Sequence, residues 1–558
     1  MTRSRSDSPL RPFDAHLTRR RALIHAGAGL AALGAAGAVS LPDPAAAQDA
    51  TPVATPPGTA EAPGTVTPAR AALVVARLPT LAQEIMAKTG VPGMAVAVVF
   101  GDAVAFADGF GVRQLGGSEK VEADTVFQLA SLSKPVASTV VAAVVGDGKL
   151  AWTSRLADVA PGFALREAWP TQEVTLADLF AHRSGLGDHA GDLLEDLGFG
   201  RDEILRRLRF LDPAYSFRGG YRYTNFGLTA AAVAAARVAG MAWEDLSAAR
   251  LYRPLGMAHT SSRFADYMAE PNRAIPHVKR GGAWAVTPEQ RNPDAQTPAG
   301  GVSSTARELA QWVRLQLGQG AFNGRPLIPV EALAPTHVPQ AVSQSPPDAA
   351  TRQAGFYGLG WNVGYDNAGA VHWSHSGAFA LGAATAVFLL PGSGFGVLAL
   401  TNGSPVGAPE ALCLSVLDLA LGRAAARDWL AVVTPDFAAL AEPAYGTGTD
   451  WGAAPADVTP ARPDDAYLGI YRNDYYGDAA IVRAGTGLAL RIGPKPNEFG
   501  LTHYARDTFS WQPSGENATV RSGLTFSVGA DGRASGFTDE YLASGGPGSL
   551  TRSEAAPG

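Results

Sequence analysis

Apolar and polar positions along the chain predict two β-hairpins that lie far apart in the sequence. Residues 94–100 are almost continuously apolar, a Gly-Asp turn follows, and a second β-like run covers residues 103–109. Residues 384–390 and 395–401 repeat this arrangement on either side of a Pro-Gly-Ser-Gly turn. Short apolar runs that are bounded by turn residues are typical of strands, so we expect both pairs to form hairpins.

The sequence between the two hairpins favours helices. Helical periodicity is clear in residues 135–145, 176–182, 229–238 and 305–317, and a further helix is expected over residues 408–421. A sheet assembled from both ends of a domain, with a helical middle inserted, is the simplest arrangement of these elements. The sequence therefore predicts an α+β fold in which helices flank an antiparallel sheet and a helical subdomain is added.

A second, smaller domain is expected at the C-terminal end. The chain has 558 residues, which is more than the roughly 250 to 300 residues that a single core accommodates. Pro and Gly are frequent in residues 441–463, which we interpret as a linker between a large domain over residues 71–440 and a small one over residues 464–558. Short β-like runs separated by Gly, Asn and Asp predict that the small domain is an all-β barrel or sandwich.

The N-terminal segment has the features of an export signal. Residues 19–21 are three arginines, an apolar run rich in Ala and Gly follows, and residues 45–47 are three alanines. A charged start, an apolar centre and a small-residue cleavage site are typical of such signals. We therefore interpret residues 1–47 as a twin-arginine export signal and expect a periplasmic or extracellular protein, with an uncleaved anchor as the alternative. Residues 48–70, rich in Pro, Thr and Ala, are expected to form a disordered linker.

Composition excludes several classes of partner and site. The formal net charge is −6 and no block of Lys or Arg follows the N-terminal segment, so we expect neither nucleic acid nor a membrane partner beyond the signal. The one cysteine, Cys413, excludes an intramolecular disulfide framework and cysteine-rich metal sites. His182 and His189 lack the other ligands of a metal site, so no metal or cofactor is expected. Nothing in the sequence indicates an oligomeric state.

A serine and a lysine are spaced so that they can act together. Ser131 and Lys134 stand three residues apart at the start of a helical stretch, and positions i and i+3 share one face of a helix. A serine hydroxyl becomes a good nucleophile when a neighbour accepts its proton, and a desolvated lysine with a lowered pKa can do so. The helix N-terminus adds free N–H groups and a favourable dipole. A helix cap followed by a surface lysine has the same pattern, so further motifs must decide.

Two further segments complete the pattern. Tyr223 and Asn225 lie in a Gly-rich loop just before a helix. A strand just ahead of the second hairpin contains His375, Ser376, Gly377 and Ala378. In this order and spacing, the three segments resemble the S-x-x-K, Y-x-N and K-T-G set of the serine beta-lactamases and penicillin-binding proteins. Four more segments resemble the class C-like branch of that superfamily, at residues 176–186, 253–257, 298–304 and 357–361.

The resemblance covers about residues 75–425 and implies a beta-lactamase/transpeptidase-like fold. It also implies roles for the polar residues of the motifs. Ser131 would attack a carbonyl group and form an acyl-enzyme. Lys134 would take the proton of the Ser131 hydroxyl or hold that hydroxyl deprotonated. Tyr223, with a phenol kept partly ionised by nearby cations, would relay protons, and Asn225 would bind the substrate amide.

The strand that contains His375 would complete the site. The resemblance implies that the backbone N–H groups of Ser131 and Ala378 form an oxyanion hole. His375 would orient the substrate and supply positive or hydrogen-bonding character, with Ser376 and Gly377 as the adjoining substrate-binding positions.

Two positions depart from the pattern of the resemblance. His375 stands where beta-lactamases of this branch usually carry Lys, and Ala378 stands where they often carry Ser or Gly. A histidine is cationic only near or below a pKa of about 6.5, so it holds a substrate carboxylate poorly. The sequence therefore predicts an exported serine hydrolase that cleaves a small ester, or a D-amino-acid peptide or amide. Two alternatives stay open, a class C-like beta-lactamase that hydrolyses beta-lactams and an inactive module that binds penicillin or peptidoglycan.

The small β-domain resembles an uncharacterised domain that is often appended to these hydrolases, through its segment of residues 471–477. Tyr475 and Tyr476 in this segment are expected to serve packing rather than to line a pocket. No activity of its own is expected for the domain.

Overall fold

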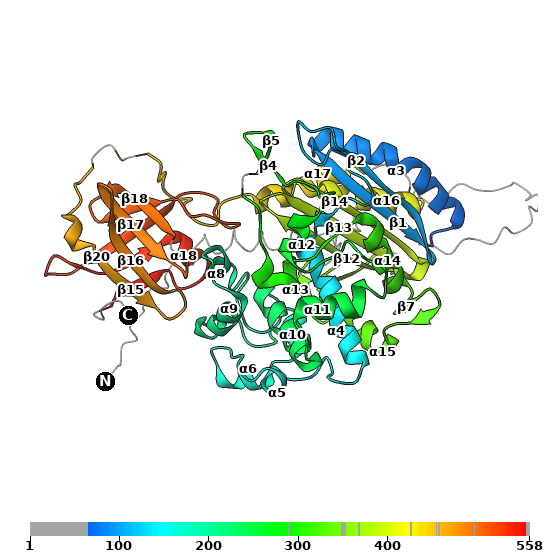
Figure 1. Cartoon of the computed structure of the whole chain (residues 1–558), viewed down its shortest axis with the longest axis horizontal. Coiled ribbons are helices and arrows are strands. Elements are labelled where there is room, and N and C mark those ends of the chain that lie inside the picture. The colour runs from blue at the N-terminus through cyan, green and yellow to red at the C-terminus, as the bar shows by residue number, and fades with distance from the viewer. Residues whose placement is uncertain are drawn as a thin grey trace, which may run out of the picture.

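The computed structural model describes two domains that lie side by side (Figure 1). It covers residues 65–553 apart from residues 288, 347–352, 367–368, 424–426, 454, 456–457 and 496. The expected export signal, residues 1–47, and the linker as far as residue 64 lie outside the described residues. The predicted combination of an α+β domain and a C-terminal all-β domain is confirmed.

The large domain is built on an eight-stranded antiparallel sheet with the order β2-β1-β14-β13-β12-β11-β10-β9. Its strands are β1 (Gly93–Phe100), β2 (Ala103–Gly111), β9 (Ala341–Gln344), β10 (Gly355–Tyr357), β11 (Asn362–Tyr365), β12 (Val371–Phe379), β13 (Ala383–Leu390) and β14 (Phe395–Thr401). The two predicted hairpins meet where β1 pairs with β14, with Val98 opposite Val397. The sheet is thus assembled from both ends of the domain, as predicted.

Helices cover both faces of this sheet, which explains why β1 is apolar throughout. The helices α3 (Pro68–Thr89), α16 (Ala408–Ala420) and α17 (Trp429–Leu440) pack on one face, and α14 (Ala306–Leu317) packs on the other. Successive side chains of a strand point to opposite faces, so Val96 contributes to the first core and Ala97 to the second. Residues 68–70, assigned to the linker from the sequence, form the first turn of α3.

Apart from α14, the chain between β2 and β9 forms the helical subdomain. Its central helix α4 (Ser133–Gly146) is apolar and buried on nearly all sides. The other helices are α5 (Leu156–Val159), α6 (Ala168–Glu173), α7 (Leu176–Phe180), α8 (Asp192–Asp196), α9 (Arg201–Arg207), α10 (Asn225–Ala239), α11 (Trp243–Ser247), α12 (Phe264–Ala269), α13 (Thr297–Gly300) and α15 (Val330–Leu333). Three two-stranded pairs complete it, β3 (Phe127–Gln128) with β6 (Ser303–Ser304), β4 (His277–Arg280) with β5 (Ala283–Val286), and β7 (Ala321–Phe322) with β8 (Arg325–Pro326).

The C-terminal domain is a closed antiparallel barrel, which decides between the barrel and the sandwich that the sequence left open. Its strands are β15 (Gly469–Asn473), β16 (Gly477–Ala484), β17 (Gly487–Ile492), β18 (Glu498–Ala505), β19 (Thr508–Trp511), β20 (Ser522–Val528), β21 (Ala534–Asp539) and β22 (Ser549–Arg552), with α18 (Glu540–Gly545) between the last two. Aromatic side chains such as Tyr471, Trp511 and Phe526 fill its interior.

The helices α8 and α9 lie between the barrel and the rest of the large domain (Figure 1). The phenol of Tyr475 accepts a hydrogen bond of 3.0 Å from the Gly191 N–H, and the Tyr475 carbonyl accepts one of 2.6 Å from Arg207. Tyr476 donates to the Leu542 carbonyl at 2.7 Å, and both tyrosines are fully buried. The tyrosine pair therefore packs the barrel and ties it to the large domain, but Tyr476 also lines a hollow beside α9, contrary to the expectation.

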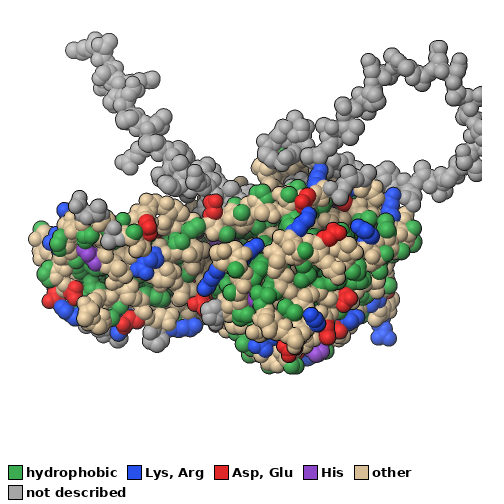
Figure 2. All heavy atoms as spheres, turned by 90° about the horizontal axis from the view of Figure 1, so that it is seen from above, with side chains coloured by type: hydrophobic (Ala, Val, Ile, Leu, Met, Phe, Trp, Pro, Cys, Tyr) green, Lys and Arg blue, Asp and Glu red, His purple; other side chains and the backbone are tan. Residues whose placement is uncertain are grey.

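The surface carries charges of both signs. On the face shown in Figure 2, acidic and basic side chains are interspersed and form no extended patch of one sign. Within the described residues, no single helix is long and apolar enough to span a membrane. The bent pair of α10 and Trp243–Tyr252 reaches that length and composition only when joined, and α10 is buried in the subdomain.

Candidate active site

Ser131 lies in the short 3-10 helix Ala130–Leu132, which runs directly into α4. Ala130 has a φ of 48°, a conformation that costs a residue with a side chain about 1–2 kcal/mol. Strain of this kind persists where the surrounding structure fixes the backbone, and it is frequent at active sites. Ala130 and Leu132 are fully buried, whereas Ser131 between them is partly exposed. The hydroxyl is therefore held in a fixed and accessible position.

Lys134 is completely buried beside Ser131. Its Nζ atom lies 2.9 Å from Ser131 Oγ, 2.7 Å from Asn225 Oδ1 and 3.0 Å from the carbonyl oxygen of Ala299. Burial lowers the pKa of Lys134 from 10.5 to about 7, against the opposing effect of the Asp192 charge. An amine with this pKa is available as a base near neutral pH.

Two carbonyl groups fix the direction in which the Lys134 amine points. Asn225 Oδ1 and the Ala299 carbonyl are acceptors only, so each takes one N–H of the amine. A neutral amine has two N–H bonds and one lone pair, so its lone pair then faces the Ser131 hydroxyl. Asn225 is itself oriented, because its Nδ2 donates to Asp192 Oδ2 at 2.8 Å. Asp192 on α8 therefore positions Asn225 and, through it, Lys134.

Tyr223 lies against both Ser131 and Lys134. The centroid of its ring is 4.4 Å from Lys134 Nζ, and its phenol is hydrogen-bonded to the Ser131 side chain. Burial raises the pKa of Tyr223 well above 10.0, so the phenol is protonated at neutral pH. The expectation of a partly ionised phenol is therefore wrong, because the loss of hydration outweighs the opposing effect of the hydrogen bond with Ser131.

The loop after α7 holds Tyr223 through its backbone. The Tyr223 N–H donates to Asp188 Oδ1 at 2.8 Å, and the Tyr223 carbonyl accepts from the His189 N–H at 2.8 Å. The Thr224 N–H donates to His182 Nδ1 at 3.2 Å, so the proton of that imidazole is on Nε2. The ring of His182 is 4.6 Å from that of Tyr223, and burial keeps the pKa of His182 well below 6.5. His182 is thus a neutral group packed against Tyr223.

His375 is neutral and both of its ring nitrogens are engaged. Its Nδ1 donates to the Ser376 carbonyl at 2.6 Å, so Nε2 accepts from the Tyr357 phenol at 2.9 Å. Burial, followed by the proximity of Lys134, lowers the pKa of His375 to about 3. The positive character that the sequence analysis allowed for His375 is therefore absent at neutral pH. Both ring nitrogens of His375 form their hydrogen bonds with other residues of the protein, Ser376 and Tyr357.

Gly377 lets β12 approach Ser131 closely, whereas the Ser376 side chain, expected to bind substrate, is hydrogen-bonded to Glu410 on α16. A side chain at Gly377 would place its Cβ 2.1 Å from the Leu129 carbonyl oxygen and 2.8 Å from the Leu132 nitrogen. Only glycine therefore lets β12 pack on the turn that carries Ser131. Ser376 is largely buried, whereas Ala378, opposite Ala384 of β13, is partly exposed.

Three contributors to the site are not apparent from the sequence. The Ala299 carbonyl and the Tyr357 phenol belong to segments that carry the resemblance, but no side-chain pattern shows that they reach Lys134 and His375. Asp192 has no motif signal at all, and its role follows only from its contact with Asn225. Contacts of this kind form only when the chain packs, so no local sequence pattern predicts them.

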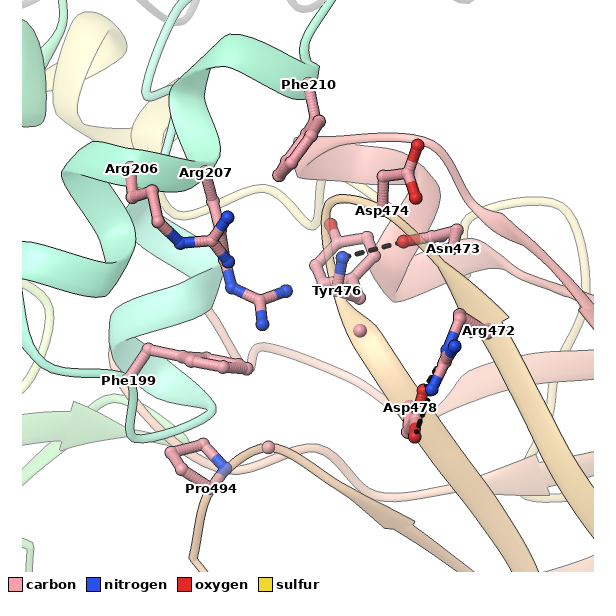
Figure 3. A pocket seen from close by; sticks show the side chains of 12 residues that line it. Phe199, Arg206, Arg207, Phe210, Arg472, Asn473, Asp474, Tyr476, Asp478 and Pro494 are labelled. Carbon is pink, nitrogen blue, oxygen red and sulfur yellow. Dashed lines mark hydrogen bonds and ion pairs between the residues drawn. The ribbon is translucent and has the colours of Figure 1, made fainter. Parts of the chain in front are cut away.

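A separate hollow of about 500 Å³ lies between α9 and the barrel (Figure 3). Each of its arginines is paired within the protein, since Glu203 pairs with both Arg206 and Arg207, and Asp478 pairs with Arg472. The hollow therefore offers no unpaired guanidinium to a ligand, and we assign it no function.

The fold and the group formed by Ser131, Lys134 and Tyr223 define a serine hydrolase of the beta-lactamase fold. Residues 78–421 match the family described as Beta-lactamase, and the chain belongs to this family. Residues 453–545 match a domain of unknown function (DUF3471), which corresponds to most of the barrel.

Individual relatives agree with this assignment. Penicillin-binding protein 4 of Amycolatopsis lactamdurans is 31% identical over 56% of this chain and 81% of its own length. Esterase EstB of Burkholderia gladioli is 28% identical over 37% of this chain and 55% of its own. The octameric penicillin-binding protein homologue from Pyrococcus abyssi shares the fold, with a TM-score of 0.54 and 18% identity over 84% of this chain and 98% of that chain.

Proposed function

We propose that this chain is an exported serine hydrolase that cleaves a small ester, or a D-amino-acid peptide or amide, through an acyl-enzyme on Ser131. The observation that carries the proposal is the buried Lys134 amine 2.9 Å from the Ser131 hydroxyl, with a pKa lowered to about 7. A structural lysine would have no reason to be desolvated beside a serine that stays accessible.

The contacts support a two-step reaction. Lys134 takes the proton of Ser131 as Oγ bonds to the substrate carbonyl carbon, and the resulting oxyanion is held by the N–H groups of Ser131 and Ala378. The bond to the leaving group then breaks, and the proton passes to that group from Lys134, with the protonated Tyr223 phenol as relay. Water then attacks the acyl carbon as Lys134 takes a proton from the water. The bond between that carbon and Ser131 Oγ breaks, and Lys134 returns the proton to Oγ, which releases the acid and restores both residues.

The environment of His375 favours ester or amide substrates over beta-lactams. A beta-lactam carries a carboxylate that a fixed cation would hold, but His375 is neutral and both its nitrogens are engaged. The name of the esterase relative supports an ester. Beta-lactam hydrolysis is the second candidate, because the family match itself favours it.

Intact-mass detection of acyl adducts tests the chemistry. The protein is incubated with a fluorophosphonate and with a panel of small esters, D-aminoacyl amides and beta-lactams. We expect one adduct per chain that disappears in Ser131→Ala and persists in Ser133→Ala, a serine in the same turn whose hydroxyl accepts from the Val302 N–H. Folded protein that forms no adduct with any reagent would instead indicate a binding module. Nitrocefin turnover as fast as ester cleavage would establish a beta-lactamase.

Export is tested separately from catalysis. Replacing the three arginines at residues 19–21 with lysine keeps the charge but removes the pair that the twin-arginine pathway reads. We expect the variant to accumulate inside the cell, while the unchanged protein is exported and begins at Gln48. Equal export of both proteins would overturn this part of the proposal.

A further inference from the structure

A chain of hydrogen bonds connects an exposed histidine with the buried Lys134 amine. His189 Nδ1 lies 2.8 Å from Asp192 Oδ2. Asn225 Nδ2 donates to the same oxygen at 2.8 Å, and Asn225 Oδ1 accepts from Lys134 Nζ at 2.7 Å. The His189 side chain is 47% exposed, whereas that of Asp192 is 7% exposed and Lys134 is fully buried. The chain therefore leads from the protein surface to the proposed base.

The backbone around His189 holds its ring next to Asp192. The His189 N–H donates to the Tyr223 carbonyl at 2.8 Å, and the His189 carbonyl accepts from the Asp192 N–H at 3.0 Å. His189 has a φ of 56°, in the left-handed region that is uncommon for residues other than glycine. Because a carboxylate is an acceptor, His189 Nδ1 carries the proton of its hydrogen bond to Asp192. The histidine is thus a fixed donor to this carboxylate.

The Asp192 carboxylate depends on two donors. Its Oδ2 accepts from Asn225 and from His189, and its Oδ1 has no hydrogen-bond partner among the described residues. Little water reaches a side chain that is 7% exposed. Each donated N–H places the positive end of a dipole next to the carboxylate and so weakens the effect of its charge on other groups. His189 therefore supplies one of the two N–H groups that screen Asp192.

The Asp192 charge in turn acts on Lys134. Burial lowers the pKa of Lys134 to about 7, and the negative charge of Asp192 opposes this effect because it favours the protonated amine. The better Asp192 is screened, the less it opposes the effect of burial. The hydrogen bond from His189 therefore keeps the pKa of Lys134 lower than it would be with Asn225 as the one donor to Asp192.

Other ionisable groups surround this chain of hydrogen bonds. Burial keeps the tyrosines among them protonated and the histidines neutral at neutral pH. Within the described residues, none of these groups donates a hydrogen bond to the Asp192 carboxylate, so none replaces His189. They are Tyr223, Tyr475, His182, His375, Glu195, Arg291 and the ion pair of Asp188 with Arg222.

We propose that His189 is a positioning residue that acts through Asp192 and makes Lys134 a better acceptor for the proton of Ser131. The inference rests on the acyl-enzyme proposed above, in which Lys134 is the base. The His189 ring donates to Asp192 and not to the reacting atoms. It orients the carboxylate that holds Asn225, and it screens the charge that would otherwise keep the Lys134 amine protonated.

The pH profile of acylation tests the proposal in the full chain. His189→Phe keeps a ring at this position but removes its N–H, so the Asp192 charge acts more strongly on Lys134. We expect the pH at which the acylation rate is half its plateau to rise by about 0.5 to 1 unit. Stopped-flow acylation by a neutral ester should then be about three- to tenfold slower at pH 6. At pH 9 the rate should match that of the unchanged protein, because the amine is neutral in both.

Two further variants serve as matched controls. His189→Asn keeps an N–H at the place of Nδ1 and tolerates the left-handed backbone, so it should keep the original midpoint. His259→Phe removes another partly exposed histidine that lies next to a carboxylate, 3.3 Å from Glu270, and should leave the profile unchanged.

A double variant shows whether His189 acts through Asp192. Asp192→Asn removes the charge that favours the protonated amine, so we expect the midpoint to fall. Adding His189→Phe to Asp192→Asn should then cause no further rise, because the charge that His189 screens is gone. Melting curves show whether each variant is folded.

The outcomes separate this inference from the proposed function. An original midpoint in folded His189→Phe, an original midpoint in Asp192→Asn, or an equal rise from His189→Phe with and without Asp192 would overturn the role of His189. Each of these results leaves the acyl-enzyme intact. Absence of a Ser131 adduct in the unchanged protein at every pH would overturn the proposed function itself.

Discussion

The Lys134 amine and the Ser131 hydroxyl are 2.9 Å apart, and the two N–H bonds of the neutral amine are directed to Asn225 and Ala299. This arrangement leaves the lone pair of the amine for the proton of Ser131. Burial supplies the lowered pKa, and the two carbonyl groups supply the direction. The reactivity of the pair therefore depends on contacts from three separate segments of the chain.

The first prediction concerns pH. Below a pKa of about 7 Lys134 is protonated and cannot accept the Ser131 proton, and above it the amine is neutral. We therefore expect the acylation rate to fall about tenfold per pH unit below pH 7 and to level off above it. Stopped-flow acylation by a neutral ester between pH 5 and pH 9 measures this. A flat profile, or an active Lys134→Arg variant, would show that Lys134 is not the base.

The second prediction concerns Tyr223. Tyr223→Phe removes the phenol next to Ser131 but keeps the ring that packs against Lys134 and His182. We expect kcat/KM to fall by about 10²- to 10⁴-fold, the usual contribution of a group that relays protons, with little change in melting temperature. Tyr504→Phe, on the barrel, is the matched control. Full activity of Tyr223→Phe would show that the Tyr223 hydroxyl takes no part in the reaction and that the residue serves packing alone.

The third prediction concerns Gly377. Gly377→Ala places a Cβ 2.1 Å from the Leu129 carbonyl, so β12 and the turn carrying Ser131 must move apart. We expect a loss of stability of about 1–3 kcal/mol and a loss of acylation rate of about 100-fold, because a displacement of this size misaligns the site. Gly392→Ala, which meets no atom within 4 Å, should match the unchanged protein. Equal melting temperatures and rates for the two variants would contradict the proposed packing.

The fourth prediction links the barrel to the catalytic group. Asp196→Ala removes the acceptor for Glu516, Asn517 and one side of Arg291, and it leaves buried donors unpaired. We expect a loss of stability of about 3 kcal/mol and slower acylation, because α8 also carries Asp192, which orients Asn225. Asp465→Ala breaks an exposed pair with Arg483 and should cost less than about 1 kcal/mol. If Asp196→Ala is destabilised but its acylation rate is unchanged, the contact between the two domains does not influence the active site.

Local pattern carries most of the fold. Strands such as β1 and β14 are short apolar runs with turn residues at their ends, and helices such as α14 show a clear periodicity, so their limits agree with the sequence to within one or two residues. The closure of the C-terminal strands into a barrel depends on pairing between β15 and β22, which are more than seventy residues apart. No local pattern encodes that pairing.

The sequence by itself determined that Ser131 and Lys134 lie together, because a helix places residues three apart on one face. The tertiary structure decided the protonation states. Burial keeps the Tyr223 phenol protonated, contrary to the ionisation that the resemblance implied, and it keeps His375 neutral. It also brought Asp192 to Asn225 and Glu516 to the end of β12, since contacts between distant segments arise only when the chain packs.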